Sequence, residues 1–175
     1  MRWIREHAES LGIAPNEIVL MGGSAGGHLA RSTALFESID DKRDNLNLST
    51  EPNAFILMYP VIDASKKGYG QTKIGPRGRG LSPVHNVRRG LPPILMFHRT
   101  ADAVTPYPGA ERFHELAMAA KNLCRLVTHP GGRHGSIIFD PKMFDGALEQ
   151  MQTFLREQDL LFDAAEDVPA TKSEE

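Results

Sequence analysis

The ten residues MGGSAGGHLA, from Met21 to Ala30, place one serine between two pairs of glycines. Residues 22–26 fit the pattern G-x-S-x-G, which between a strand and a helix makes a sharp turn that presents the serine hydroxyl. The spacing therefore predicts that Ser24 is a nucleophile at the start of a helix. In that position the backbone N–H of Ala25 can bind the oxyanion that forms when the serine attacks.

A glycine-rich turn after a strand has other uses, and the simplest is a serine that only caps the following helix. A phosphate-binding loop of the Walker type requires Lys followed by Ser or Thr, whereas His28 and Leu29 occupy those positions. The dinucleotide-binding pattern would require glycine in place of Ser24. The nucleophile and the helix cap are therefore the two interpretations that remain.

A serine nucleophile needs a histidine as base, and the histidine needs a carboxylate that orients it. In hydrolases with this turn the chain order is serine, then acid, then histidine, with the last two in loops after later strands. Asp102 lies in RTAD after one apolar segment, and His134 lies in PGGRHG after the next. Alone, each could be a turn acid or a surface histidine, but together they predict a triad of Ser24, Asp102 and His134.

Apolar segments and helical patterns alternate along the chain and predict the scaffold for these three residues. Strands are expected at 17–22, 53–59, 92–98 and 123–129, and helices at 1–11, 25–38, 108–121 and 140–158. This order predicts an α/β fold with a mostly parallel sheet of about four strands flanked by helices, in which chemistry gathers beyond the C-terminal strand ends. We expect one domain over 1–158 and a disordered acidic tail over 159–175.

The composition is that of an ordinary globular protein, with 175 residues, 41% hydrophobic, 24% charged and a net charge of -2. Basic residues are concentrated in 64–101, which contains no acidic residue. In the overlapping Gly- and Pro-rich stretch 63–91, Tyr69 is the one aromatic residue that could stack on a base. We therefore expect a long solvated surface segment and no nucleic-acid partner.

The sequence does not indicate a cofactor, a metal site or a membrane span. Cys124 is the single cysteine, and the pair His129 and His134 has no third ligand cluster nearby, so no metal and no organic cofactor is expected. No apolar run approaches the roughly 18 residues of a membrane span. The N-terminal MRWIREHAESLG lacks the apolar core of a secretory signal, which predicts a cytoplasmic protein if the chain is complete and otherwise leaves its location open.

Five segments in order, GGSAGGHLA, YPVIDAS, LSPVHNV, PPILMFHRTAD and GGRHG, resemble the C-terminal portion of α/β-hydrolases of the esterase/lipase type. The likeness is to the acetyl-xylan-esterase-like and carbohydrate-esterase-like branch and covers residues 1–158. It implies hydrolysis of carboxylic esters with acetyl or other short acyl groups, often on carbohydrates, by an acyl-enzyme on Ser24. From its position alone, His28 on the helix just after the turn either lines the site as a substrate-binding residue or simply packs against its neighbours.

Two features depart from the family pattern. The family reads H-G-T-x-D where this chain has HRTAD, so Arg99 replaces a glycine and, at positive φ, would strain the loop by about 1 kcal/mol. No segment resembles the HGGG-type loop that donates a second oxyanion N–H. Strand 17–22 would then form a sheet edge, open to strand pairing or oligomerisation.

Two further functions remain open at this stage. A truncated hydrolase without activity could persist as a binding or interaction module that docks through strand 17–22 or through the basic segment. A peptidase of the prolyl-oligopeptidase type has the same chain order of serine, acid and histidine.

Overall fold

The computed structural model describes residues 1–36, 40–66, 68–70 and 74–162. Within them one parallel sheet has the strand order β1-β2-β3-β4, with Met21 opposite Ile56 and Ile56 opposite Leu95. The strands are β1 (Val19–Gly23), β2 (Ala54–Met58), β3 (Ile94–Arg99) and β4 (Cys124–His129). The predicted α/β fold with a four-stranded parallel sheet is confirmed. The predicted tail from residue 163 onward and residues 37–38 of the predicted helix lie outside the described residues.

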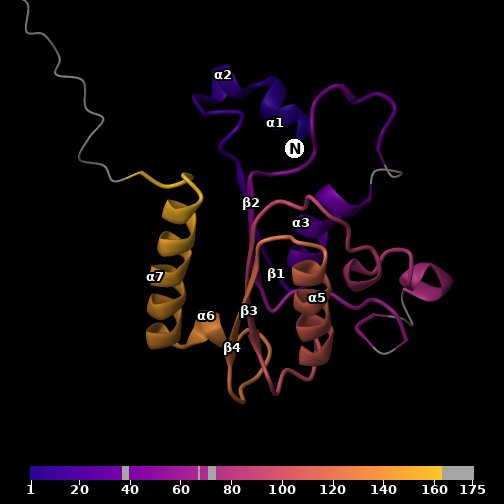
Figure 1. The fold of residues 1–175 in the computed structure, drawn as a ribbon, viewed down its shortest axis with the longest axis vertical. Coiled ribbons are helices and arrows are strands. Elements are labelled where there is room, and N and C mark those ends of the chain that lie inside the picture. The colour runs from indigo at the N-terminus through magenta and orange to yellow at the C-terminus, as the bar shows by residue number, and fades with distance from the viewer. Residues whose placement is uncertain (37–39, 67, 71–73, 163–175) are drawn as a thin grey trace, which may run out of the picture.

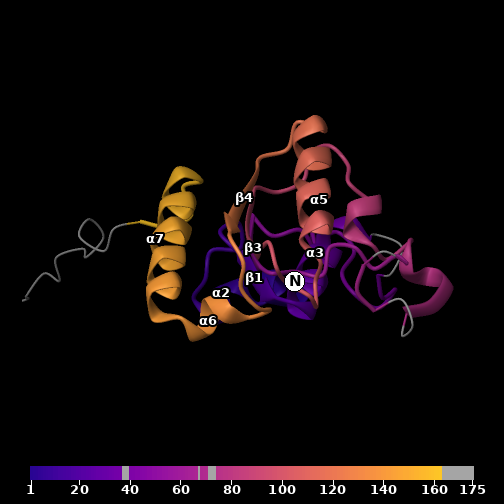
Figure 2. The ribbon, with the colours of Figure 1, turned by 90° about the horizontal axis from the view of Figure 1, so that it is seen from below.

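Helices cover the sheet on both faces (Figures 1 and 2). α3 (Ala25–Leu35) and α5 (Tyr107–Ala119) lie on one face, and α7 (Pro141–Glu157) lies on the other. The short α6 (Ser136–Phe139) follows β4 and leads into α7; the sequence pattern did not predict it. Because all strands are parallel, the loops that follow them gather at one edge, at the lower end of the sheet in Figure 1.

The core consists of two apolar layers, one on each face of the sheet. Along β2 all five residues are buried, with Phe55 and Leu57 packed toward α3 and α5 and Ile56 and Met58 packed toward α7. Phe113 of α5 and Phe154 of α7 are fully buried. Burial on both faces explains why the central strands are continuous apolar runs rather than alternating ones.

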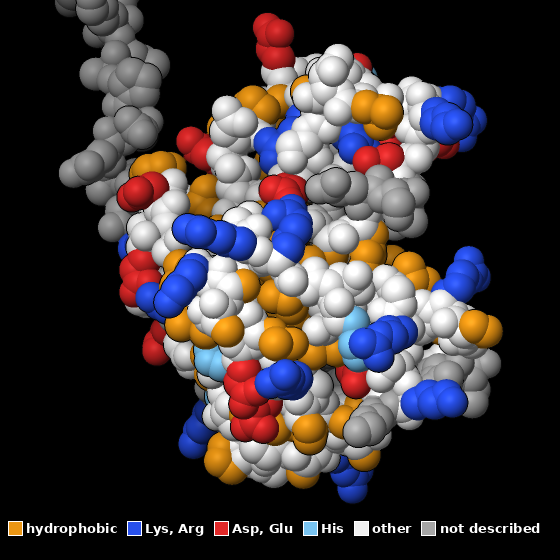
Figure 3. All heavy atoms as spheres, turned by 45° about the vertical axis from the view of Figure 1, so that its right-hand side comes forward, with side chains coloured by type: hydrophobic (Ala, Val, Ile, Leu, Met, Phe, Trp, Pro, Cys, Tyr) orange, Lys and Arg blue, Asp and Glu red, His pale blue; other side chains and the backbone are white. Residues whose placement is uncertain are grey.

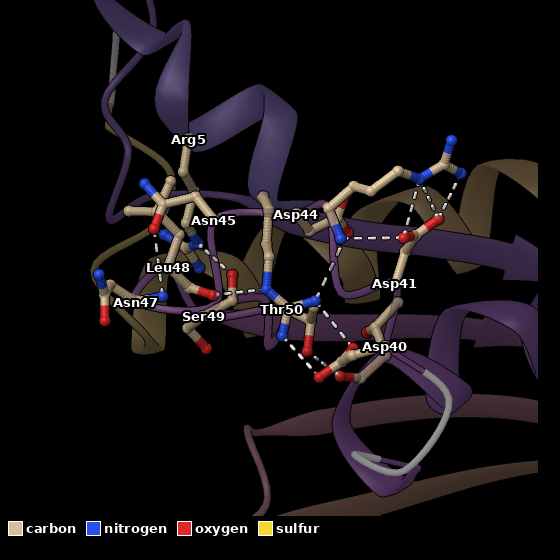
Figure 4. A network of polar contacts seen from close by, with 12 residues as sticks. Arg5, Asp40, Asp41, Asp44, Asn45, Asn47, Leu48, Ser49 and Thr50 are labelled. Carbon is tan, nitrogen blue, oxygen red and sulfur yellow. Dashed lines mark hydrogen bonds and ion pairs between the residues drawn. The ribbon is translucent and has the colours of Figure 1, made fainter.

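The N-terminal segment differs from the single amphipathic helix predicted over 1–11. The helix breaks at His7 (φ -106°, ψ 17°) into α1 (Arg2–Glu6) and α2 (Ala8–Leu11), and Trp3 is 60% exposed. Polar contacts hold this segment instead. Arg2 donates to both carboxylate oxygens of Asp40 at 2.8 and 2.7 Å and to the carbonyl of Leu48 at 2.9 Å. Asp40 and Leu48 are labelled in the polar network of Figure 4.

The basic segment contains two short 3₁₀ turns, η2 (Gly75–Gly78) and η3 (Pro83–His85). Arg88 forms an ion pair with Glu51, and on the face shown in Figure 3 basic side chains are separated by apolar, neutral and acidic groups. This distribution favours the solvated-surface interpretation. Lys67 and Lys73 lie outside the described residues. No helix within the described part of the chain is long and apolar enough to cross a bilayer.

Strand β1 lies at one edge of the sheet. Among the described residues it pairs only with β2, and Met21 on it is 53% exposed. An apolar edge with free backbone donors and acceptors is the surface expected for strand 17–22.

Arg31 of α3 is the largest polar residue in the core. Its side chain is fully buried, and none of its three nitrogens has a hydrogen-bond partner among the described residues. The guanidinium lies 4.5 Å from the ring centre of Phe55 and 5.1 Å from that of Phe113. Burial lowers the pKa of Arg31 to about 10, so the group keeps its charge at neutral pH. Two aromatic faces compensate only part of the cost of that buried charge.

Replacement of Arg31 by Met should stabilise the protein, because an unbranched apolar side chain fills the same space without a desolvated charge. We expect an increase of about 1–3 kcal/mol in the free energy of unfolding, measured by urea denaturation. Arg89→Met is the matched control: Arg89 is exposed, and a change within about 0.5 kcal/mol is expected. A loss of stability in Arg31→Met would show that the arginine has a partner that compensates its burial.

Candidate active site

The turn between β1 and α3 holds Ser24 in a strained backbone conformation, with φ 52° and ψ -121°. Its N–H donates to the carbonyl of Met58 at 3.0 Å, and its own carbonyl accepts from the N–H of Val61 at 3.0 Å. A non-glycine residue at positive φ persists only where the surroundings determine its conformation. Here the end of β2 supplies that restraint, and the hydroxyl of Ser24 is presented beyond the C-terminal edge of the sheet.

The glycines of the turn have distinct roles. A Cβ at Gly22 would lie 2.4 Å from the carbonyl oxygen of Gly26, so only glycine allows the backbone to fold back so tightly. A Cβ at Gly27 would lie 2.6 Å from Cβ of Pro60, whereas one at Gly26 would meet no atom within 4 Å. A side chain would therefore fit at position 26, whereas the close approach of the helix to its neighbour lies at Gly27.

The three predicted catalytic residues lie in contact. Nε2 of His134 is 2.8 Å from Oγ of Ser24, and Nδ1 of the same ring is 2.7 Å from Oδ2 of Asp102. Ser24 follows β1, Asp102 follows β3, and His134 follows β4, so the parallel sheet brings together residues up to 110 positions apart. In this geometry the hydroxyl can donate to the imidazole while the imidazole donates to the carboxylate.

Asp102 is buried, yet its carboxylate accepts four hydrogen bonds. Oδ1 accepts from the N–H groups of Val104 at 2.8 Å and Thr105 at 2.9 Å, and Oδ2 accepts from the Thr105 hydroxyl at 3.0 Å and from His134. Burial alone would raise the pKa of Asp102, but the hydrogen bonds from Thr105, His134 and Val104 together hold it below the ordinary value. The group is therefore a carboxylate at neutral pH.

Two further residues pack against the triad and were not predicted as part of it. Tyr59, at the end of β2 and also at positive φ (39°), places its ring edge-on to the His134 imidazole with 4.7 Å between ring centres. Burial, and then the charge of Asp102, raises the pKa of Tyr59. His98 of β3 is buried beside Asp102 and donates from Nε2 to the carbonyl of Thr105 at 2.7 Å.

Arg99 does not strain the acid loop as the sequence comparison suggested. It is the last residue of β3 and is not among the residues with positive φ. Its guanidinium instead donates to the carbonyl of Gly131 at 3.0 Å and to that of Pro130 at 3.1 Å. The side chain lies against Gly132, where a Cβ would be 1.6 Å from Nε. Arg99 thus joins the strand that carries the acid loop to the loop that carries His134.

The remaining predicted site residues lie on α3. Ala25 is the first residue of the helix and is exposed, and a helix leaves its first N–H groups without intrahelical partners. The Nε2 atom of His28 is 2.6 Å from the carbonyl of Leu81, a contact that ties α3 to the basic segment. A substrate contact by His28 therefore stays a prediction. No group of three or more potential metal ligands occurs within the described residues.

Comparison with known proteins identifies relatives of this fold. Residues 1–78 match the family model described as alpha/beta hydrolase fold, and residues 74–160 match that described as TAP-like protein. Esterase 2 of Thermogutta terrifontis, in a structure phosphoramylated by tabun, superposes with a TM-score of 0.85 at 37% identity, over 93% of this chain and 62% of that one. The chain therefore has the alpha/beta hydrolase fold and is similar to esterases that share it.

Curated relatives are longer and more distant. The acetylxylan esterase of Xylanibacter ruminicola is 28% identical over an alignment of 150 positions, which covers 77% of this chain and 29% of the relative. Endo-1,4-beta-xylanase B of Butyrivibrio fibrisolvens is 28% identical over an alignment of 158 positions, which covers 83% of this chain and 25% of the relative. The chain thus spans less than a third of the length of either protein. Other structures of T. terrifontis esterase 2 have propionate or butyrate bound.

The turn geometry predicts opposite effects for two neighbouring glycines. Gly22→Ala should destabilise the protein by about 1–3 kcal/mol, since the added methyl group meets the backbone of Gly26. Gly26→Ala should raise stability by about 0.5–1 kcal/mol, because it adds a helix-favouring residue in open space. Urea denaturation of both variants measures the difference, and equal effects would contradict the described turn.

Replacement of Arg99 by Ala should loosen the loop that carries His134, because it removes the contacts to two carbonyls of that loop. We expect amide hydrogen exchange in 130–135 to become about tenfold faster, as for a segment that loses about 1.4 kcal/mol of local stability. Mass spectrometry of exchange in peptides from α5 provides the internal control, where rates should not change. Unchanged exchange in 130–135 would show that Arg99 does not restrain the loop.

Proposed function

We propose that this protein hydrolyses carboxylic esters of short acyl groups through an acyl-enzyme on Ser24. The observation that carries the proposal is one imidazole, His134, placed 2.8 Å from the Ser24 hydroxyl and 2.7 Å from the Asp102 carboxylate. A serine hydroxyl is a weak nucleophile unless a base removes its proton, and this arrangement supplies the base and orients it.

The reaction proceeds in two halves. Ser24 Oγ attacks the ester carbonyl while Nε2 of His134 takes the hydroxyl proton, and Asp102 stabilises the imidazolium that results. The imidazolium then protonates the leaving alcohol, and the acyl group stays on Ser24. A water molecule attacks the acyl-enzyme with His134 again as base, which releases the carboxylic acid and restores the serine. Each half moves one proton through Nε2, so neither requires a cofactor.

The tetrahedral intermediates carry an oxyanion that needs donors. The N–H of Ala25 stands next to Ser24 at the start of α3, where the positive end of the helix dipole also favours negative charge. Removal of one oxyanion donor from a serine hydrolase costs about 2.7–4 kcal/mol, or 100- to 1000-fold in rate. With Ala25 as the single donor assigned here, we expect turnover well below that of a hydrolase with two.

The relatives support an ester with a small acyl group as the substrate. One of them is named an acetylxylan esterase, and T. terrifontis esterase 2 has been crystallised with propionate and with butyrate. Acetyl, propionyl and butyryl esters are therefore the proposed substrates, and acetylated carbohydrates are the natural class to compare with simple alcohol esters. A peptidase of the prolyl-oligopeptidase type would instead cleave peptides, which makes a peptide p-nitroanilide the contrasting substrate.

A second candidate function rests on the exposed edge of β1. The strand has no partner on one side among the described residues, and Met21 there is 53% exposed. A catalytically inactive chain could pair through residues 17–22 with another strand, as a binding module or an oligomer. The two functions differ in the reactivity of Ser24, because a fluorophosphonate probe labels only an activated serine.

Ester hydrolysis should depend on the serine and on its base. Using p-nitrophenyl acetate, we expect turnover by the natural chain that falls at least a thousandfold in Ser24→Ala and in His134→Ala. The same two variants should lose labelling by a fluorophosphonate probe. Ser32→Ala is the matched control, because Ser32 lies on the same helix as Ala25 and its hydroxyl bonds only to the carbonyl of His28. If the natural chain turns over the ester no faster than either variant and is not labelled by the probe, the inactive binding module is favoured.

A further inference from the structure

Thr105 uses every polar group it has at the candidate active site. Its side chain is buried, with a residue exposure of 2%, and its N–H donates to Oδ1 of Asp102 at 2.9 Å. Its carbonyl accepts from Nε2 of His98 at 2.7 Å. Its hydroxyl lies 3.0 Å from Oδ2 of Asp102, 3.2 Å from Nδ1 of His134 and 3.2 Å from the carbonyl of Tyr59. No other described residue contacts both the acid and the base of the triad through one atom.

The hydroxyl has one proton to donate, and the acceptors decide where it goes. Nδ1 of His134 carries its own proton toward Oδ2 of Asp102, so it cannot accept from Thr105. Two acceptors remain, Oδ2 of Asp102 and the carbonyl of Tyr59. A hydrogen bond to an ionised carboxylate is about twice as strong as one to a neutral carbonyl, so the proton points to Asp102. The lone pairs of Oγ1 then face the Nδ1–H of His134.

This arrangement fixes the direction of the Asp102 carboxylate. The N–H groups of Val104 and Thr105 both donate to Oδ1. These two bonds alone would still let the Asp102 carboxylate rotate about their axis. The Thr105 hydroxyl holds the second oxygen, Oδ2, in line with Nδ1 of His134. Tyr59 packs edge-on against the same imidazole. The ring of His134 is thus in contact with both the Tyr59 ring and the Thr105 hydroxyl.

We propose that Thr105 is a positioning residue of the triad, whose hydroxyl orients Oδ2 of Asp102 and the imidazole of His134 toward Ser24. It acts through Asp102 and His134 and does not contact the reacting ester. The inference rests on the proposed ester hydrolysis for its kinetic consequence. Its structural consequence, a well-ordered Nδ1–H bond from His134 to Asp102, can be measured without turnover.

The test compares Thr105→Val, which keeps the branched shape and removes the hydroxyl, with Thr105→Ser, which keeps the hydroxyl. For p-nitrophenyl acetate we expect kcat to fall about tenfold in Thr105→Val with KM within about twofold, since one hydrogen bond to a charged group is lost. Thr105→Ser should keep kcat within about threefold. Thr128→Val is the control, because its exposed hydroxyl bonds to that of Tyr107 and, among the described residues, to no member of the triad.

A second measurement separates this inference from the proposed function. With ¹⁵N-labelled histidine, NMR reports how fast the Nδ1 proton of His134 exchanges with water. We expect exchange several-fold faster in Thr105→Val and unchanged in Thr105→Ser and Thr128→Val. If the natural chain shows no turnover, the proposed function fails and the exchange rates alone decide the role of Thr105. The proposal for Thr105 would be overturned if Thr105→Val kept the kcat and the exchange rate of the natural chain. Equal losses of kcat in Thr105→Ser and Thr105→Val would also overturn it.

Discussion

The candidate site depends on one backbone constraint, the positive φ of Ser24. That conformation is costly for a residue with a side chain, and here three contacts maintain it: the hydrogen bonds of Ser24 to Met58 and Val61, and the close approach of Gly22 to Gly26. All three join the turn to its own strand, to β2 or to the loop that follows β2. The buried β2 therefore does more than fill the core, because its C-terminal end holds the serine hydroxyl in the direction of His134.

Two buried charges in this protein show different solutions to desolvation. The carboxylate of Asp102 has four hydrogen bonds and keeps its charge with a lowered pKa. The guanidinium of Arg31 has no hydrogen-bond partner in the described structure and only the faces of Phe55 and Phe113. The first charge orients an imidazole, and its cost is compensated locally. The second serves no contact that the site requires, so the stability of the sheet must offset it.

The sequence predicted those features that follow from pattern and chain order. Apolar periodicity located the four strands, and the turn motif with the order of acid and base located Ser24, Asp102 and His134. Contacts between loops could not be read in this way, because Thr105, Tyr59 and Arg99 act through side-chain directions that only the folded sheet determines. Arg99 is the clearest case: its sequence difference suggested strain, whereas its place in β3 allows it to bind the neighbouring loop. The break at His7 likewise follows from polar contacts of Arg2 and Arg5 that periodicity does not encode.

The proposed chemistry requires proton transfer and oxyanion stabilisation, and the described residues provide more groups for the first than for the second. Proton transfer needs Ser24, His134, Asp102 and the groups that orient them, and all of these come from loops after β1, β2, β3 and β4. Oxyanion stabilisation has only the N–H of Ala25, at the exposed start of α3 beside the edge strand. A second donor would have to approach Ser24 from a side that the loops after β2, β3 and β4 do not already occupy. Among the described residues β1 pairs only with β2, so the outer side of this edge strand, which leads directly into Ser24, is open to a further donor for the proposed oxyanion site.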